Sequence, residues 1–162
     1  MKRVAALGLD VGRRRVGIAG CDGLGLIATG ITTIHRTSLA RDIEQLREIV
    51  EERQIDLLVV GLPYSMNGEI GTQAKQVQRF TDKVSRALDL PVEYVDERLT
   101  SVEATAQLKA QKRFNSRDKG AIDKQAATII LQQWLDSRRQ KLAQENYNSQ
   151  SELDAWSCRL TN

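Results

Sequence analysis

The sequence predicts an α/β fold in which helices flank a mixed β-sheet. Three short segments rich in apolar and β-branched residues come first, at Val4 to Val11, Val16 to Cys21 and Leu26 to Ile34. After residue 38 the pattern changes to helical and strand-like segments in alternation. Strands joined by tight turns pair antiparallel, whereas strands separated by helices pair parallel. We therefore expect three antiparallel strands first, followed by alternating helix and strand.

The second half of the predicted sheet begins after a helix. Ser38 can cap a helix that runs to about Gln54 with one apolar face. The run Leu57 to Leu62 is unbroken and apolar, which is typical of a strand buried on both faces of a parallel sheet. The remaining elements are a loop at Pro63 to Gly71, a helix to about Leu88, a strand at Val92 to Val95, a helix opened by Thr100 with Glu103 as its capping box, a basic loop at Lys112 to Lys119, and a last helix from about Gly120 to Arg139.

Length and composition fit one domain followed by a short tail. The chain has 162 residues, of which 41% are hydrophobic and 28% charged, values close to the averages for globular proteins. We expect residues 1–140 to form the domain and residues 141–162 to form a polar C-terminal tail. From about Glu145 the tail shows no apolar period, so we expect it to be flexible or loosely docked.

Several classes of protein are excluded by what the chain lacks. No apolar run approaches the roughly 20 residues that span a bilayer, and the run before Asp10 is too short for a signal peptide. We therefore expect a cytoplasmic protein that does not bind membranes. Cys21 and Cys158 lack the spacing of a disulfide framework or a zinc site. His35 is the only histidine, which excludes zinc sites of the two-histidine kind.

Charge is unevenly distributed although the net charge is only +3. Arg13, Arg14 and Arg15 form a basic cluster beside Asp10, and the segment from Arg98 to Lys124 is also basic. Basic segments next to acidic residues fit a polyanionic substrate that is drawn to a metal site. The same charges could equally be a solvated surface.

Asp10 is the first candidate for a functional residue. It follows a strand interior of apolar or small residues, and side-chain alternation places Ala6 and Gly8 on its face. Small neighbours leave room for a close approach. An aspartate also commonly ends a strand at a turn, so both interpretations stay open from the residues alone.

Asp123 is the second candidate because of where its helix places it. At helical spacing it shares the apolar face of Ala127, Ile130 and Trp134. An unpaired charge on such a face is costly, so the carboxylate needs a cation. Lys119, Lys124 or a metal ion could supply it.

The third candidate is one of the pair Asp96 and Glu97, which follow the strand at Val92 to Val95. Alternation sends their side chains to opposite faces, so only one is expected to join Asp10. Sites in open α/β sheets form beyond the carboxyl ends of the parallel strands. A site with only oxygen ligands favours Mg²⁺ or Mn²⁺ over zinc.

Four segments give the chain a resemblance to a known family. Together they span nearly the whole chain before Arg139, and their order makes the resemblance specific. The chain resembles the YqgF/RuvX proteins in GLDVGRRRVGIAGCD (Gly8 to Asp22), VVGLPYSMNGEIG (Val59 to Gly71), VDERLTSVEA (Val95 to Ala104) and DKGAIDKQAATIILQQWL (Asp118 to Leu135). Cys21 is a departure, since many relatives have serine there.

The resemblance implies an RNase H-like fold and a metal-dependent nuclease. Members are described as nucleases that mature the 5′ end of pre-16S rRNA or as Holliday junction resolvases. The implied catalytic and metal-binding triad is Asp10, Glu97 and Asp123, which favours Glu97 over Asp96. Two Mg²⁺ or Mn²⁺ ions about 4 Å apart would serve the reaction. Candidates for contact with the nucleic acid are Arg13, Arg14, Arg15, Asn67, Arg98, Lys112, Arg113 and Arg117.

Other interpretations of the sequence stay open. The substrate could be precursor rRNA or branched DNA, and the protein a monomer or a homodimer. A nuclease-like domain can also act as a non-catalytic RNA-binding module. Sugar kinases and actin-like ATPases open with a similar strand-turn-strand, but 162 residues leave little room for the second domain that such enzymes normally need.

Overall fold

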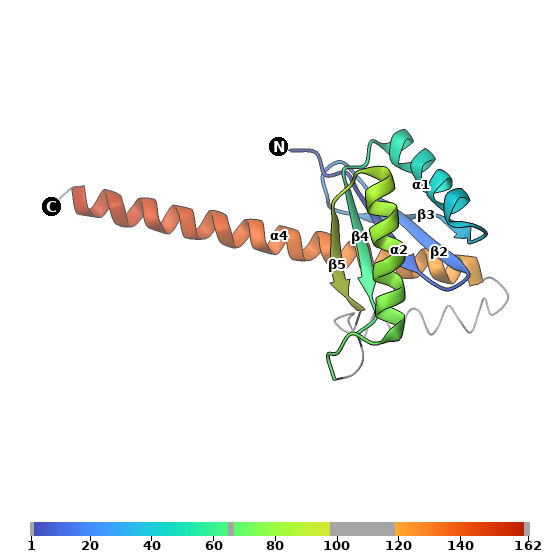
Figure 1. The fold of residues 1–162 in the computed structure, drawn as a ribbon. Helices are drawn as coiled ribbons and strands as arrows, with labels where there is room; N and C mark the ends of the chain where they lie inside the picture. Colours follow the sequence, from blue (N-terminus) through green and yellow to red (C-terminus); the bar gives the residue numbers. More distant parts are fainter. Residues whose placement is uncertain (1, 65–66, 98–118, 161–162) are drawn as a thin grey trace.

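A mixed sheet forms the centre of the part of the chain that the structure describes (Figure 1). The structure is a computed structural model and describes residues 2–64, 67–97 and 119–160. Within these ranges the strand order is β3-β2-β1-β4-β5. The elements are β1 (Ala6–Val11), β2 (Arg15–Cys21), β3 (Ala28–His35), α1 (Leu39–Arg53), β4 (Leu57–Leu62), α2 (Thr72–Leu88), β5 (Val92–Asp96) and α4 (Lys119–Leu160). The helix predicted to begin at Thr100 lies outside the described residues.

The first three strands form the predicted antiparallel meander. β1 pairs antiparallel with β2, and β2 pairs antiparallel with β3. The turn between β1 and β2 is closed by the Gly12 amide, which donates to the Arg15 carbonyl oxygen at 2.8 Å. The register between β2 and β3 shifts between Ile18 and Ala19, and such a bulge increases the local twist of the strands. This half of the predicted fold class is confirmed.

The other two strands run parallel and are reached through helices. β4 pairs parallel with β1, and β5 pairs parallel with β4. The predicted cap of α1 is confirmed, because the Ser38 hydroxyl accepts from the Arg41 amide at 3.3 Å. Gln54 and Asp89 end α1 and α2 in the left-handed conformation, with φ of 53° at each. A left-handed residue at this position ends the helix and turns the chain toward the next strand.

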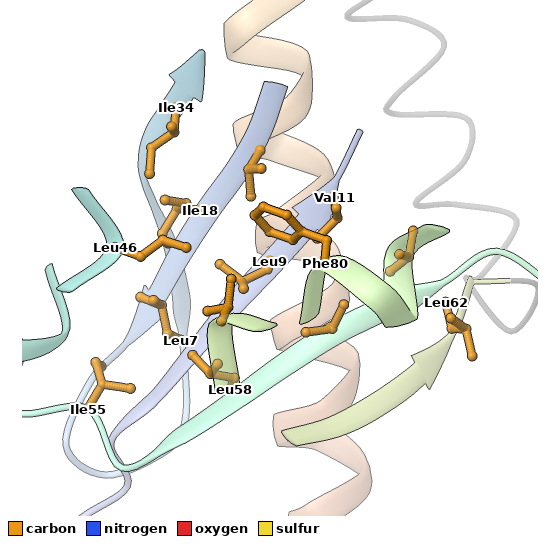
Figure 2. Packing of buried hydrophobic residues seen from close by; sticks show 14 of the residues in the cluster. Leu7, Leu9, Val11, Ile18, Ile34, Leu46, Ile55, Leu58, Leu62 and Phe80 are labelled. Carbon is orange, nitrogen blue, oxygen red and sulfur yellow. The ribbon is translucent and has the colours of Figure 1, made fainter. Parts of the chain in front are cut away.

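One face of the sheet packs on α1 and α2. Figure 2 shows Phe80 of α2 lying over Leu9 of β1, while Leu46 of α1 lies beside Ile18 of β2. Each of these side chains is at most 4% exposed. Burying a side chain of this size contributes about 1.5–3 kcal/mol relative to leaving it in water. This core therefore fixes the positions of β1 and β2, which also form the opposite face of the sheet.

The opposite face is built from small residues and carries α4 (Figure 1). Alternation places Ala6, Gly8 and Asp10 of β1 on this face, together with Gly17 of β2. A Cβ added to Gly17 would lie 2.0 Å from the carbonyl oxygen of Asp123 on α4. The helix backbone therefore rests directly on the backbone of the sheet, which only glycine permits at this point.

The predicted end of the last helix is wrong. The sequence predicts a helix that ends near Arg139, but α4 is one helix over its full 42 residues. No glycine or proline follows Gly120, so no helix-breaking residue interrupts the segment. Residue 140 lies inside this helix; the division into a domain of residues 1–140 and a polar tail of residues 141–162 stays a prediction.

The second half of α4 leaves the sheet and projects into solvent (Figure 1). Residues 139–160 are all exposed. Side chains one turn apart bond to each other there, as in Gln144 to Asn148 and Gln150 to Asp154, each at 3.1 Å. Such pairs support an exposed helix by a few tenths of a kcal/mol each, about 0.2–0.5. In the described part of the chain, no helix is long and apolar enough to cross a membrane.

The seating of α4 predicts a large cost for a single methyl group at Gly17. In the Gly17→Ala protein, the added Cβ would clash with the Asp123 carbonyl, so α4 must shift away from the sheet. We expect a loss of about 1–3 kcal/mol in the free energy of unfolding, the usual cost of overpacking a core. Urea denaturation measures this free energy.

Gly23→Ala is the matched control. The nearest atom to a Cβ at Gly23 lies 3.7 Å away, an ordinary contact with the Arg3 side chain. Its free energy of unfolding should change by less than about 0.5 kcal/mol. Equal stability of the two variants would contradict the tight seating of α4 on Gly17.

Candidate active site

Asp10 lies near the end of the central strand, on the face that carries α4. Its partner across the antiparallel ladder is Gly17. On the other side, the last pair of the parallel ladder is Leu9 with Val60, so Gly61 comes next to Asp10 at a strand spacing of about 4.8 Å. The carboxylate of Asp10 therefore stands between two neighbours that have no side chains.

Asp123 approaches Asp10 from α4. Its carbonyl oxygen lies directly over Gly17, the residue that pairs with Asp10. Its carboxylate accepts from Arg15, whose Nε lies 2.6 Å from Oδ2, and both side chains are about a quarter exposed. The sequence predicted that a lysine or a metal ion would neutralise Asp123. The neighbouring Lys124 instead extends over Gly30 of β3, and the partner of Asp123 is an arginine 108 positions away.

Glu97 approaches from the opposite side, directly after β5. Its Oε1 lies 2.6 Å from the position that a Cβ on Gly61 would occupy, so its carboxylate reaches over β4 toward β1. Asp96 is paired in register with Leu62, and Leu62 belongs to the core under α1 and α2. The two acids thus follow the alternation that the sequence predicts, with Glu97 on the face of Asp10.

Burial and like charge both disfavour the ionised form of Glu97. Desolvation raises the pKa of its carboxyl above the ordinary value, and the nearby negative charge of Asp96 raises it further. A carboxylate in this position gains from any cation that approaches it. The electrostatics of the site therefore favour a positively charged ligand.

The chemistry of the donors fits a hard divalent cation. Carboxylate oxygens are the ligands that Mg²⁺ and Mn²⁺ prefer, and the glycines beside Asp10 let the Asp123 backbone and the Glu97 carboxylate come close to the sheet. Among the described residues, however, no three Asp, Glu, His or Cys side chains are already grouped as a metal site. Asp123 holds Arg15 through Oδ2, so a metal ion that binds this carboxylate would have the guanidinium as its neighbour.

The predicted nucleic-acid contacts lie in different settings. Arg13 and Arg14 are exposed in the turn between β1 and β2, whereas Arg15 is half-buried against Asp123. Asn67 is exposed, and its side-chain oxygen accepts from the Glu69 amide at 3.2 Å, which shapes the loop before α2. The remaining candidates, Arg98, Lys112, Arg113 and Arg117, lie outside the described residues.

Arg36, whose side chain contacts α1 and α2 on the other face of the sheet, supports the turn after Asp10 and was missed by the sequence analysis. It donates to the Gly12 carbonyl at 2.7 Å, lies 3.7 Å from the Asp42 carboxylate and stacks 4.4 Å above the Phe80 ring. A hollow of about 270 Å³ beside it is also lined by Arg13. Arg36 thereby fixes the turn after Asp10. No local spacing connects these residues, so periodicity could not have found the contact.

The sequence matches the model of one known family. The RuvX family model, described as Holliday junction resolvase, matches residues 4–137. The chain belongs to the RuvX family. The match includes all three candidate acids and ends before the exposed half of α4.

Curated relatives match this RuvX-family chain over almost their whole length. A protein of Rippkaea orientalis is 71% identical over 139 residues, which are 86% of this chain and 100% of that protein. A protein of Synechocystis is 67% identical over 147 residues, 91% of this chain and 97% of that protein. Both carry the name "Putative pre-16S rRNA nuclease". The chain is thus a member of a family of nucleases, hydrolases that act on the phosphodiester bonds of nucleic acids.

Solved structures confirm the RNase H-like fold of this RuvX-family chain. RuvC of Thermus thermophilus in complex with a Holliday junction gives a TM-score of 0.55 at 12% identity, covering 84% of this chain and 96% of that one. The yeast mitochondrial Holliday junction resolvase gives 0.56 at 11% identity, covering 92% and 85%. At such low identity the likeness concerns the fold alone.

The raised pKa of Glu97 predicts a pH-dependent stability difference. A carboxyl whose pKa is higher in the folded state destabilises the fold when it is ionised, so Glu97→Gln should be more stable than the wild type at pH 7. The gain should shrink as the pH falls through the folded pKa and vanish below about 4.3, the ordinary value for glutamate. Urea denaturation of both proteins between pH 4 and 7 measures it; a gain that does not change with pH would contradict this electrostatic origin.

Proposed function

We propose that this chain is a metal-dependent endonuclease of the cytosol that matures the 5′ end of pre-16S rRNA. The observation that carries the proposal is the arrangement of Asp10, Glu97 and Asp123 over one stretch of the sheet, in a chain of the RuvX family. The names of the relatives at 71% and 67% identity support rRNA as the substrate.

In this proposal the three acids are the metal ligands. Asp10 stands on β1 at the centre of the sheet, Glu97 reaches over Gly61, and Asp123 is carried by α4 over Gly17. Two bound Mg²⁺ or Mn²⁺ ions would stabilise the charge on the attacking and leaving oxygens of the phosphodiester. The three ligands come from elements held by two separate cores, so their relative positions are set by the fold.

The residues around the acids would bind and orient the substrate. Arg13 and Arg14 are exposed in the turn that directly follows β1, where they can contact phosphates on the strand that enters the site. Arg36 holds this turn in place through Gly12. Asn67, in the loop before α2, is a further candidate for contact with the sugar-phosphate backbone.

Cleavage of Holliday junctions is the second candidate function. It is favoured by the description of the RuvX family and by the likeness of the fold to two junction resolvases. A panel of precursor rRNA, single-stranded RNA and four-way junction DNA, each with Mg²⁺ or Mn²⁺, separates the two. Preferential cleavage of the junction would replace the rRNA proposal.

Asp10→Asn tests whether the acids carry the reaction. The amide keeps the shape of the side chain but removes the ligand charge, and losing metal-based stabilisation of several kcal/mol lowers the rate by about three orders of magnitude. The protein should remain folded, because an isosteric amide leaves no cavity. It should bind RNA as the wild type does while cleaving it barely, as measured by single-turnover cleavage and by electrophoretic mobility shift.

Two controls accompany this variant. EDTA should abolish cleavage by the wild type, and added Mg²⁺ or Mn²⁺ should restore it. Wild-type cleavage rates in Asp10→Asn would show that the activity does not use this site. A wild-type protein that binds RNA but cleaves none of the substrates would identify a non-catalytic RNA-binding module instead.

The exposed arginines predict a change in the salt dependence of binding. Replacing Arg13 and Arg14 together with glutamine should weaken RNA binding and reduce the slope of log affinity against log salt by roughly one per lost phosphate contact. Turnover at saturating RNA should change much less. Binding titrations at several salt concentrations measure the slope, and an unchanged slope would assign these two residues to a solvated turn.

A further inference from the structure

Arg15 is held in place by the sheet on both sides. Its carbonyl oxygen accepts from the Gly12 amide at 2.8 Å, and its backbone pairs with His35 of β3. Because Arg15 is two residues from Gly17 on β2, its side chain points to the face on which α4 covers Gly17. The guanidinium therefore starts from a rigid backbone that points toward the first turns of α4.

Asp123 is held just as firmly from the other element. Its carbonyl lies over Gly17, where the helix and sheet backbones meet. The contact between Arg15 Nε and Asp123 Oδ2 at 2.6 Å thus joins two side chains whose backbones cannot easily move apart. Hydrogen bonds between charged groups of this length are the stronger kind.

We propose that Arg15 is a positioning residue that stands in for the metal ion at Asp123 and competes with the metal for this carboxylate. The inference rests on the proposed function, in which Asp123 is a ligand. The guanidinium already holds Oδ2 of Asp123, and its positive charge beside this carboxylate opposes a second cation that approaches the same group. Before the metal binds, Arg15 orients Asp123 and lowers the repulsion among the acids around Asp10.

This competition has two effects of opposite sign. Without the guanidinium, the acids repel one another in the metal-free protein, so that state loses stability. The same change removes a positive charge that opposes the incoming metal, so metal affinity rises. A side chain with a merely structural role would lower the stability of the metal-free protein without tightening metal binding.

The test compares Arg15→Gln with the wild type, using Mn²⁺ alone as the probe. We expect the melting temperature without metal to fall by about 2–4 °C, and the Kd for Mn²⁺ to decrease by about tenfold, as measured by calorimetric titration and by electron paramagnetic resonance of the free ion. The rise in melting temperature on adding Mn²⁺ should be larger in the variant, because the tighter ligand stabilises more.

Arg14→Gln is the matched control, since it removes the same charge from an exposed neighbour in the same turn. Its Mn²⁺ affinity and its melting temperature should remain close to those of the wild type. Arg15→Lys keeps the charge without the planar donor, so its Mn²⁺ affinity should lie between those of the wild type and Arg15→Gln. It also provides a readout if the glutamine variant does not fold.

The outcomes separate this inference from the proposed function. Unchanged Mn²⁺ affinity in Arg15→Gln, or an equal gain in Arg14→Gln, would overturn the role of Arg15 and leave the metal site standing. Absence of Mn²⁺ binding in the wild type and in every variant would overturn the metal site and the role of Arg15 together.

Discussion

The contact between two backbones at Gly17 determines how the candidate site is built. Side chains normally keep the backbone of a helix at a distance from the sheet it covers. At Gly17 the backbone of α4 lies directly on the sheet. Asp123 therefore lies beside Arg15 and over Gly17, the residue that pairs with Asp10. Gly61 also lacks a side chain, which leaves room for the Glu97 carboxylate to reach across β4. The site is thus formed by glycines as much as by the acids.

Much of the fold could be predicted from the sequence because its signals are local. The unbroken apolar run at Leu57–Leu62 is the strand β4 with the same ends, and Ser38 caps α1 as its side chain suggests. The sequence prediction ended the last helix at Arg139 for a physical reason. Periodicity detects a helix by the face it buries, and residues 139–160 bury none. The helix propensity of this segment, and its continuity with a helix that packs on the sheet, are the signals that indicate the longer helix.

The sequence predicts which residues form the candidate site better than it predicts how they contact one another. Burial cost alone indicates that Asp123 needs a cation, and alternation indicates that Asp96 and Glu97 diverge. The choice of Glu97 came from the resemblance to the RuvX proteins, and its contact with Gly61 places it on the face of Asp10. The pairing of Arg15 with Asp123 joins positions 108 residues apart. A cluster of three arginines in sequence gave no sign that one of them would turn inward.

The exposed half of α4 gives the molecule a shape with hydrodynamic consequences. At 1.5 Å per residue, the exposed residues 139–160 extend as a rod for about 33 Å, whereas a compact domain of about 120 residues has a radius of gyration of only about 14 Å. A particle with such a rod diffuses more slowly than a sphere of equal mass. Gel filtration, which responds to the hydrodynamic radius, will therefore overstate the mass of a single chain, whereas a sedimentation coefficient interpreted for a sphere will understate it. Light scattering, which responds to mass, will count the chains correctly.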